Sequence, residues 1–123
     1  MTALLHHVQV TVPRDDEAAA IDFYGRLLGL PEIAQPPSQA SQGGAWYRLG
    51  NAELHLKPDE ISQDETRRSR RHVCIAVGDL DALRARLAAA GVERVADARP
   101  IPGVHRCFAR DPGGNRIELT AAP

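Results

Sequence analysis

Three histidines and one glutamate have the side chains and the spacing to hold a metal ion. His7 and His72 each begin a segment in which apolar and polar residues alternate, the period-2 pattern of a β-strand with two unlike faces. His55 and Glu118 lie in two further alternating segments, one in each half of the chain. Imidazole nitrogens and carboxylate oxygens are ordinary ligands of divalent transition metals.

The alternation also decides which face of each strand carries these residues. In the strands that begin at His7 and His72, valine and isoleucine occupy one face and must pack against a helix, so both histidines lie on the other face. In the later strands leucine and isoleucine take the packed face, which leaves His55 and Glu118 opposite. Glu53 shares the face of His55 and is an alternative ligand. The open positions that such a set leaves on the ion are what a catalytic metal site needs.

The two halves of the chain repeat each other, and the repeat predicts the architecture. HVQVTV at 7–12 resembles HVCIAV at 72–77. Three pairs of landmarks are separated by 65, 62 and 63 residues, namely His7 and His72, Gly29 and Gly91, and His55 and Glu118. Each half reads as a strand, a helix and three strands. We expect an α+β fold of two tandem βαβββ modules, a curled mixed sheet around a cavity in which the four candidates meet.

Local signals place these elements. Acidic residues at 15–17 favour a helix start, and Gly29 is a plausible helix end; Asp79 and Gly91 do the same in the second half. Short strands are expected near 32–34 and 95–98, and hairpins at 45–56 and 106–120. The single domain divides into module one, about 1–58, a linker, about 59–71, and module two, about 72–123. We expect the polar stretch 35–44 to be a mobile loop and the basic run 67–71 to be a solvated part of the linker.

Composition narrows the class of protein. The formal net charge is −1 over 123 residues, which gives no reason to expect a nucleic-acid or membrane partner. No apolar run approaches the roughly 18–20 residues of a membrane helix, and the N-terminus does not look like a signal peptide, so we expect a cytoplasmic protein. Cys74 and Cys107 are too few for a disulfide framework and are predicted to be buried apolar residues.

Four segments carry a family resemblance that covers nearly the whole chain. They are HHVQVTV, IDFYGRLLGL, RHVCIAVGDLDAL and FARDPGGNRIELT. With these segments the chain resembles the vicinal oxygen chelate superfamily, which includes glyoxalase I, extradiol dioxygenases, fosfomycin-modifying transferases and bleomycin-resistance proteins. The resemblance implies paired modules forming a U-shaped cavity around a divalent metal, in a homodimer. By position it implies His7, His72 and Glu118 as ligands, with His55 at the fourth ligand position.

What the resemblance implies about activity is a class and not a substrate. We expect a metal-dependent enzyme, glyoxalase-like lyase or isomerase, thiol transferase or dioxygenase in chemistry. Its small substrate would chelate Zn, Ni, Fe, Mn or Co through adjacent oxygens, with Glu118 as a catalytic group. Glyoxalase I has glutamate at the position of His55, which argues against that activity. The alternative is a metal-free protein that binds or sequesters a small molecule, as bleomycin-resistance proteins do. Whether one chain or two supply the ligands stays open.

Overall fold

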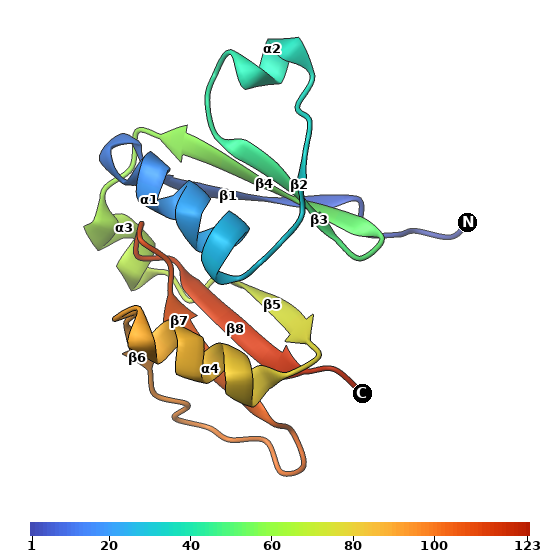
Figure 1. The fold of residues 1–123 in the computed structure, drawn as a ribbon, viewed down its shortest axis with the longest axis vertical. Coiled ribbons are helices and arrows are strands. Elements are labelled where there is room, and N and C mark those ends of the chain that lie inside the picture. The colour runs from blue at the N-terminus through green and yellow to red at the C-terminus, as the bar shows by residue number, and fades with distance from the viewer.

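The first half of the chain folds as one βαβββ module. A computed structural model describes residues 1–123, and its upper half in Figure 1 is this module. The elements are β1 (His7–Pro13), α1 (Glu17–Asp22), β2 (Glu32–Ile33), β3 (Ala45–Leu49) and β4 (Ala52–Asp59). A 3-10 turn precedes α1 and a π-helical turn, Phe23–Leu27, extends it. The four strands form a sheet in the order β1-β4-β3-β2, in which β1 and β4 are parallel.

The second half repeats this arrangement. Its elements are β5 (His72–Val77), α4 (Leu80–Ala89), β6 (Arg94–Val95), β7 (Arg106–Arg110) and β8 (Arg116–Ala121), with the sheet order β5-β8-β7-β6. The predicted fold class and its two tandem modules are confirmed, with two separate four-stranded sheets that do not close. Figure 1 shows α1 and α4 lying over one side of their sheets. None of the helices is long and apolar enough to cross a membrane.

Strand register makes the candidate residues equivalent in the two modules. Gln9, two residues after His7, pairs with His55 across β1 and β4. Cys74, two residues after His72, pairs with Glu118 across β5 and β8. His55 and Glu118 therefore hold the same place in two copies of one backbone. The equivalence inferred from sequence spacing is borne out residue by residue.

A single hydrophobic core joins the modules. It is one cluster of 17 buried residues drawn from both halves, in which the apolar faces of the long strands pack against residues of α1, the turn Phe23–Leu27 and α4. Leu54 and Leu56 of β4 and Ile117 and Leu119 of β8 are at most 1% exposed. The candidate ligands lie on the opposite face of these strands. Burial of one face thus orients the other, because a shift of one residue would bury the polar side chains.

The β7–β8 turn locks module two onto module one. Asp111 is 4% exposed, and its carboxylate accepts hydrogen bonds from the hydroxyl of Tyr24 at 2.7 Å and from the backbone amides of Gly113 and Asn115, both at 2.9 Å. The side-chain amide of Asn115 donates to the backbone carbonyl of Thr11 at 2.9 Å. The DPGGN sequence that marks the family resemblance is therefore a structural clamp between the modules.

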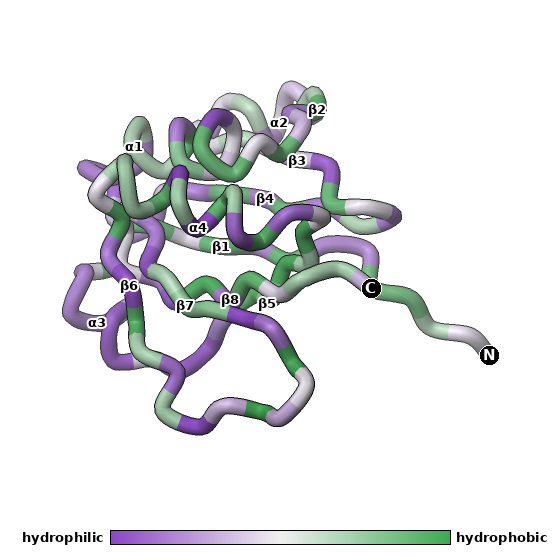
Figure 2. Tube along the Cα trace, turned by 60° about the horizontal axis from the view of Figure 1, so that its bottom comes forward, coloured by the Kyte–Doolittle hydropathy of each residue, from purple (hydrophilic) through white to green (hydrophobic).

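Two segments are more ordered than the sequence suggested. The stretch 35–44 contains a helical turn, α2 (Pro37–Ala40), and the expected linker contains α3 (Gln63–Arg68), begun by a capping box from Ser62 and Glu65. Figure 2 shows α3 as a largely hydrophilic segment, yet its Thr66 is buried and donates to the carbonyl of Gly113 at 2.6 Å. Both segments are held by side-chain contacts to backbone carbonyls far along the chain.

Candidate metal centre

His72 and Glu118 form a close pair on the open face of the second sheet. Nε2 of His72 lies 3.0 Å from Oε1 of Glu118, and Nδ1 of His72 lies 2.9 Å from the carbonyl oxygen of Arg70. The side chain of His72 is 34% exposed and that of Glu118 is 12% exposed. The pair is thus accessible but partly sheltered.

The imidazole of His72 lies between two hydrogen-bond acceptors. A carbonyl and a carboxylate only accept hydrogen bonds, whereas a neutral imidazole has a single N–H to donate. Whichever ring nitrogen carries that N–H, the other nitrogen faces an acceptor, either the carbonyl of Arg70 or the Glu118 carboxylate. With the N–H on Nδ1, a metal ion between Nε2 and Glu118 would accept both lone pairs. Two ligand atoms at right angles about 2.1 Å from one ion are about 3.0 Å apart, so this donor pair fits a divalent metal.

Arg106 and Asp97 hold Glu118 in position. Two nitrogens of the Arg106 guanidinium donate to the Asp97 carboxylate at 2.9 and 3.1 Å, and a third donates to Oε2 of Glu118 at 3.4 Å. The guanidinium of Arg106 holds the pKa of Asp97 below its usual value. Nothing in the alternation pattern pointed to Asp97, because it lies in the loop after β6 and reaches the site only through Arg106.

In module one, His55 lies between two other rings. The His7 ring stacks on it with centroids 4.2 Å apart, and the Trp46 indole stacks on it at 3.7 Å and 3°. His55 is 5% exposed, whereas His7 is exposed. Nε2 of His55 lies 2.9 Å from Oε1 of Glu53, and this contact is the main cause of the lowered pKa of Glu53. Glu53, the alternative ligand from the sequence, thus orients His55, as a carboxylate next to a ligand histidine does.

Two ring nitrogens in module one remain free to bind. Nδ1 of His55 has no hydrogen-bond partner in the chain, because only Nε2 contacts Glu53. Nε2 of His7 is likewise free, since its Nδ1 contacts Nδ1 of His6 at 2.9 Å. The indole N–H of Trp46 is buried without an acceptor. The donor set of module one is therefore also compatible with a transition metal.

Lys57 fixes α2 at the edge of this face. Its ammonium is 7% exposed and donates to the side-chain oxygen of Gln35 at 2.6 Å and to the carbonyls of Gln39 and Gly43, both at 2.8 Å. The segment expected to be a mobile loop is therefore tied to β4, two residues from His55.

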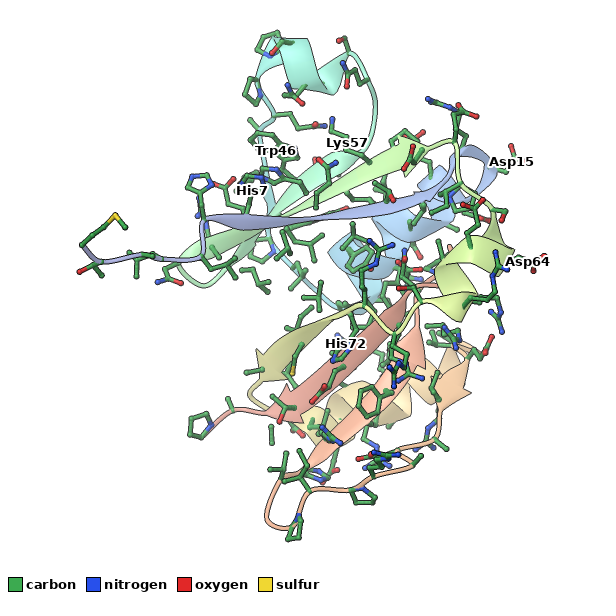
Figure 3. All side chains as sticks on the ribbon, turned by 180° about the vertical axis from the view of Figure 1, so that it is seen from behind. His7, Asp15, Trp46, Lys57, Asp64 and His72 are labelled. Atoms are coloured by element: carbon green, nitrogen blue, oxygen red, sulfur yellow. The ribbon has the colours of Figure 1, made fainter.

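Within one chain the four candidates stay in two separate pairs. His7 contacts His55 and His72 contacts Glu118, but no three His, Cys, Asp or Glu side chains of the chain form a group that could hold a metal ion. Figure 3 shows His7 beside Trp46 on the first sheet and His72 apart from them on the second. Each module thus carries one pair of the four candidate residues.

The two cysteines differ in placement. Cys107 is buried, as expected, but Cys74 is exposed, because it shares the open-face parity of His72. The prediction of burial was wrong for Cys74. Its position in the alternation, on the face of the strand away from Val73 and Ile75, already indicated that it would be exposed. Partial desolvation of its sulfur and the neighbouring Glu118 carboxylate raise the pKa of the Cys74 thiol to about 11.

Fold and candidate residues together define a duplicated βαβββ protein with an imidazole pair on the first sheet and an imidazole–carboxylate pair on the second. The model of the Glyoxalase/Bleomycin resistance protein/Dioxygenase superfamily matches residues 4–119, and the chain belongs to that superfamily. No curated protein sequence matches the chain.

Solved structures agree with this assignment. A glyoxalase family protein from Bacillus anthracis is 31% identical, with a TM-score of 0.81 over 100% of this chain and 98% of that one. Two more distant structures share the fold. Lactoylglutathione lyase from Agrobacterium tumefaciens is 20% identical (TM-score 0.70, coverage 99% and 96%). A mutant of the fosfomycin resistance protein FosX from Listeria monocytogenes, complexed with Mn(II) and a dihydroxypropylphosphonic acid, is 16% identical (TM-score 0.76, coverage 100% and 94%).

Proposed function

We propose that the protein is a divalent-metal-dependent enzyme whose site is completed by a homodimer. His7 and His55 of one chain and His72 and Glu118 of a second chain would together hold the ion. The observation that carries the proposal is that the candidate ligands lie in two pairs, or half-sites, His7 with His55 and His72 with Glu118. Neither pair alone has enough ligands for a metal site within one chain.

Two exposed apolar residues that precede the first half-site in the sequence support association with a second chain. Leu4 and Leu5 are 80% and 64% exposed, and only His6 separates them from His7. Apolar side chains next to a polar site are typical of a surface that another molecule covers. A symmetric dimer would use this surface twice and so complete two sites.

The metal, when bound, would supply Lewis-acid stabilisation to a small substrate that presents two adjacent oxygens. The residues of the chain hold its ligands and shape the site. Glu53 and the carbonyl of Arg70 fix the rings of His55 and His72, and Trp46 shields one face of His55. Glu118 is the candidate to move a proton to or from the substrate, with Arg106 fixing its Oε2.

The choice of reaction within the superfamily stays at the level of the class. A lyase, an isomerase, a thiol transferase and a dioxygenase all place substrate oxygens on the ion, and the Mn(II) of the FosX complex is one precedent for the metal. Histidine at position 55 favours a nitrogen-rich site and hence Zn, Ni, Fe, Mn or Co over magnesium or calcium.

A mixing experiment tests both the metal and its sharing between chains. We expect neither His7→Ala nor Glu118→Ala to retain metal after reconstitution, measured by mass spectrometry of tag-free protein. Mixing the two variants under conditions that exchange subunits should restore about one quarter of the wild-type metal, because half of the dimers are mixed and each carries one intact site. Glu60→Gln, which changes an exposed carboxylate outside both half-sites, is the control.

Each other outcome has a definite meaning. No metal in the wild-type protein with any of the five ions would refute the metal-dependent enzyme and favour a small-molecule binding protein. Metal that is lost in both variants but not restored by mixing would place all four ligands in one chain. That result would refute a site shared between two chains but would still support metal binding.

A further inference from the structure

A small cavity between the two modules lies next to His72. Its volume is about 260 Å³, and its lining comes from β1, β5, β8 and the segment around α3. The apolar part of the wall includes Val10, Val73 and Ile117. None of the 12 lining residues is an aspartate or a glutamate, whereas Arg71 and Arg116 both contribute. The cavity therefore has an apolar part and carries positive charge without a carboxylate.

The strand register groups this charge beside His72. Arg116 is the cross-strand neighbour of His72 in the β5–β8 pair, and Arg71 directly precedes His72 in the chain. Arg71 belongs to the basic run 67–71 that the sequence placed in a solvated linker. Arg67 of that run pairs instead with Glu93 at 2.8 Å. The run is thus divided between a surface ion pair and the cavity wall.

Neither cavity arginine has a counter-charge in the chain. The Nε–H of Arg71 donates only to the hydroxyl oxygen of Ser69, at 3.1 Å. The guanidinium of Arg116 lies 5.4 Å from the centroid of the Phe108 ring, and its Nε is buried without any hydrogen-bond partner. A buried donor of a charged group without an acceptor is unfavourable, and a ligand oxygen would satisfy it.

We propose that this cavity binds a small organic oxyanion. Its carboxylate or phosphate group would pair with Arg71 and Arg116, since guanidinium groups bind both oxyanions through two hydrogen bonds. Its apolar part would lie against Val10, Val73 and Ile117. Pockets for drug-sized ligands are roughly 300–1,000 Å³, so this cavity takes a small molecule. A single chain without metal is sufficient for this binding. Only the further step, that the bound anion is the substrate, rests on the proposed function.

An NMR titration of the full chain tests the proposal with two probes, inorganic phosphate and butyrate. We expect both to shift the arginine Nε–H signal of Arg116 in a saturable way, in protein as purified and after removal of metal with EDTA. Tighter binding of butyrate would indicate a carboxylate ligand that uses the apolar wall, and tighter binding of phosphate would indicate a phosphorylated ligand. Absence of saturable binding of either probe would overturn the proposal.

Variants separate the cavity from general positive charge. Arg116→Gln and Arg71→Gln should each weaken binding of the probe about tenfold, because each removes a charge-assisted pair. Arg68→Gln removes the same charge from the same basic run outside the cavity and should leave the affinity unchanged. Equal weakening by all three variants would overturn the proposal in favour of unspecific attraction.

The outcome with EDTA distinguishes anion binding in the cavity from anion binding at the metal centre. Loss of anion binding on metal removal would mean that the anion binds the metal, which overturns the cavity proposal and supports the metal centre. Anion binding that persists in a protein that never retains metal would refute the metal centre and leave the cavity proposal standing.

Discussion

The open faces of the two sheets share one backbone but differ in charge and in how their ligands are held. In the first sheet the candidate ligands are two imidazoles, stacked on each other and covered by Trp46. In the second they are His72 and the carboxylate Glu118. Phe108 takes the place of Trp46, since each pairs with the candidate ligand of the last strand. After duplication, therefore, the strand positions stayed and their chemistry diverged.

The supporting contacts differ in the same sense. His55 is oriented by Glu53 on its own strand, whereas Glu118 is oriented by Arg106 and, through it, by Asp97 in a distant loop. In the proposed site, module one would supply two imidazoles and module two would supply the carboxylate. A divalent ion is attracted most strongly by the anionic ligand. The comparison thus predicts unequal contributions to metal affinity.

The largest effect expected is on metal binding. Glu118→Gln should lower the affinity for metal by about a hundredfold or more, because it removes the single anionic ligand, whereas His55→Gln should lower it by about tenfold. Competition with a chromogenic chelator measures both. Glu60→Gln should bind metal as the wild type does. A greater loss in His55→Gln than in Glu118→Gln would reverse the assigned roles of the two modules.

The hairpin turns of the two modules differ as well, with a consequence for stability. A Cβ atom on Gly113 in the β7–β8 turn would lie 2.5 Å from Cγ1 of Val12, whereas one on Gly50 in the β3–β4 turn would meet nothing within 4 Å. Gly113→Ala should therefore cost about 1–3 kcal/mol of unfolding free energy. Urea denaturation measures this cost.

Gly78→Ala is the matched control, because a Cβ there is also in open space and the glycine has no positive φ. It should be neutral or slightly stabilising. If Gly113→Ala were as stable as Gly78→Ala, the DPGGN turn would not clamp the modules together.

Lys57 and Thr120 offer a smaller test of the divergence. They pair across the sheet with Thr11 and Ala76 and are equivalent by register, but Lys57 makes three hydrogen bonds to the segment 35–44 whereas Thr120 makes a single hydrogen bond. Lys57→Met should cost about 1–3 kcal/mol and expose 35–44 to proteolysis, because the hydrogen bonds to Gln35, Gln39 and Gly43 are lost.

Thr120→Val is the control for Lys57→Met. Thr120 makes one contact, to the carbonyl of His105 at 3.2 Å, so its loss should change stability little. Equal protease sensitivity of 35–44 in the wild type and in Lys57→Met would mean that the lysine does not fix the segment.

The sequence predicted the strands, the duplication and the face of each candidate ligand, because burial of one strand face is a strong local pattern. The short strand expected near 95–98 lies slightly earlier, at Arg94–Val95. The sequence did not predict α2, α3 or the position of the Lys57 side chain. These features depend on side chains that reach backbone carbonyls many residues away. Local composition favoured loops in both segments, and tertiary contacts overrode it.

The sequence predicted a set of candidate residues and left their assembly open. The alternation gave His7, His55, His72 and Glu118, and in the structure they lie in two separate pairs within one chain. Whether a second chain joins these pairs depends on an interface that no pattern in a single sequence describes. The alternation did not indicate Asp97 for a similar reason. Its role depends on Arg106, and the pattern does not show on which face of the strand Arg106 lies, because it is close to a turn.

The smallest effect expected is the pH dependence of stability that comes from the Asp97–Arg106 ion pair. Module one lacks this ion pair, because the position equivalent to Arg106 is Gly44, just before β3. The pKa of Asp97 is lowered in the folded protein, chiefly by the hydrogen bond from Arg106. A carboxyl whose folded pKa is depressed stabilises the fold above its unfolded pKa, near 4, and loses that contribution as the pH falls through the folded value.

The difference in Tm between the wild type and Asp97→Asn should therefore be largest near pH 6–7 and shrink towards pH 3, as thermal unfolding followed by circular dichroism would measure. Asp15→Asn removes an exposed carboxylate that forms no ion pair and is the control for pH effects common to all variants. A difference that stays constant from pH 7 to pH 3 would mean that Asp97 acts through packing and not through its charge. Glu118 would then be held by Arg106 without an anchored counter-ion, and the contrast in how the two modules orient their ligands would rest on Glu53 alone.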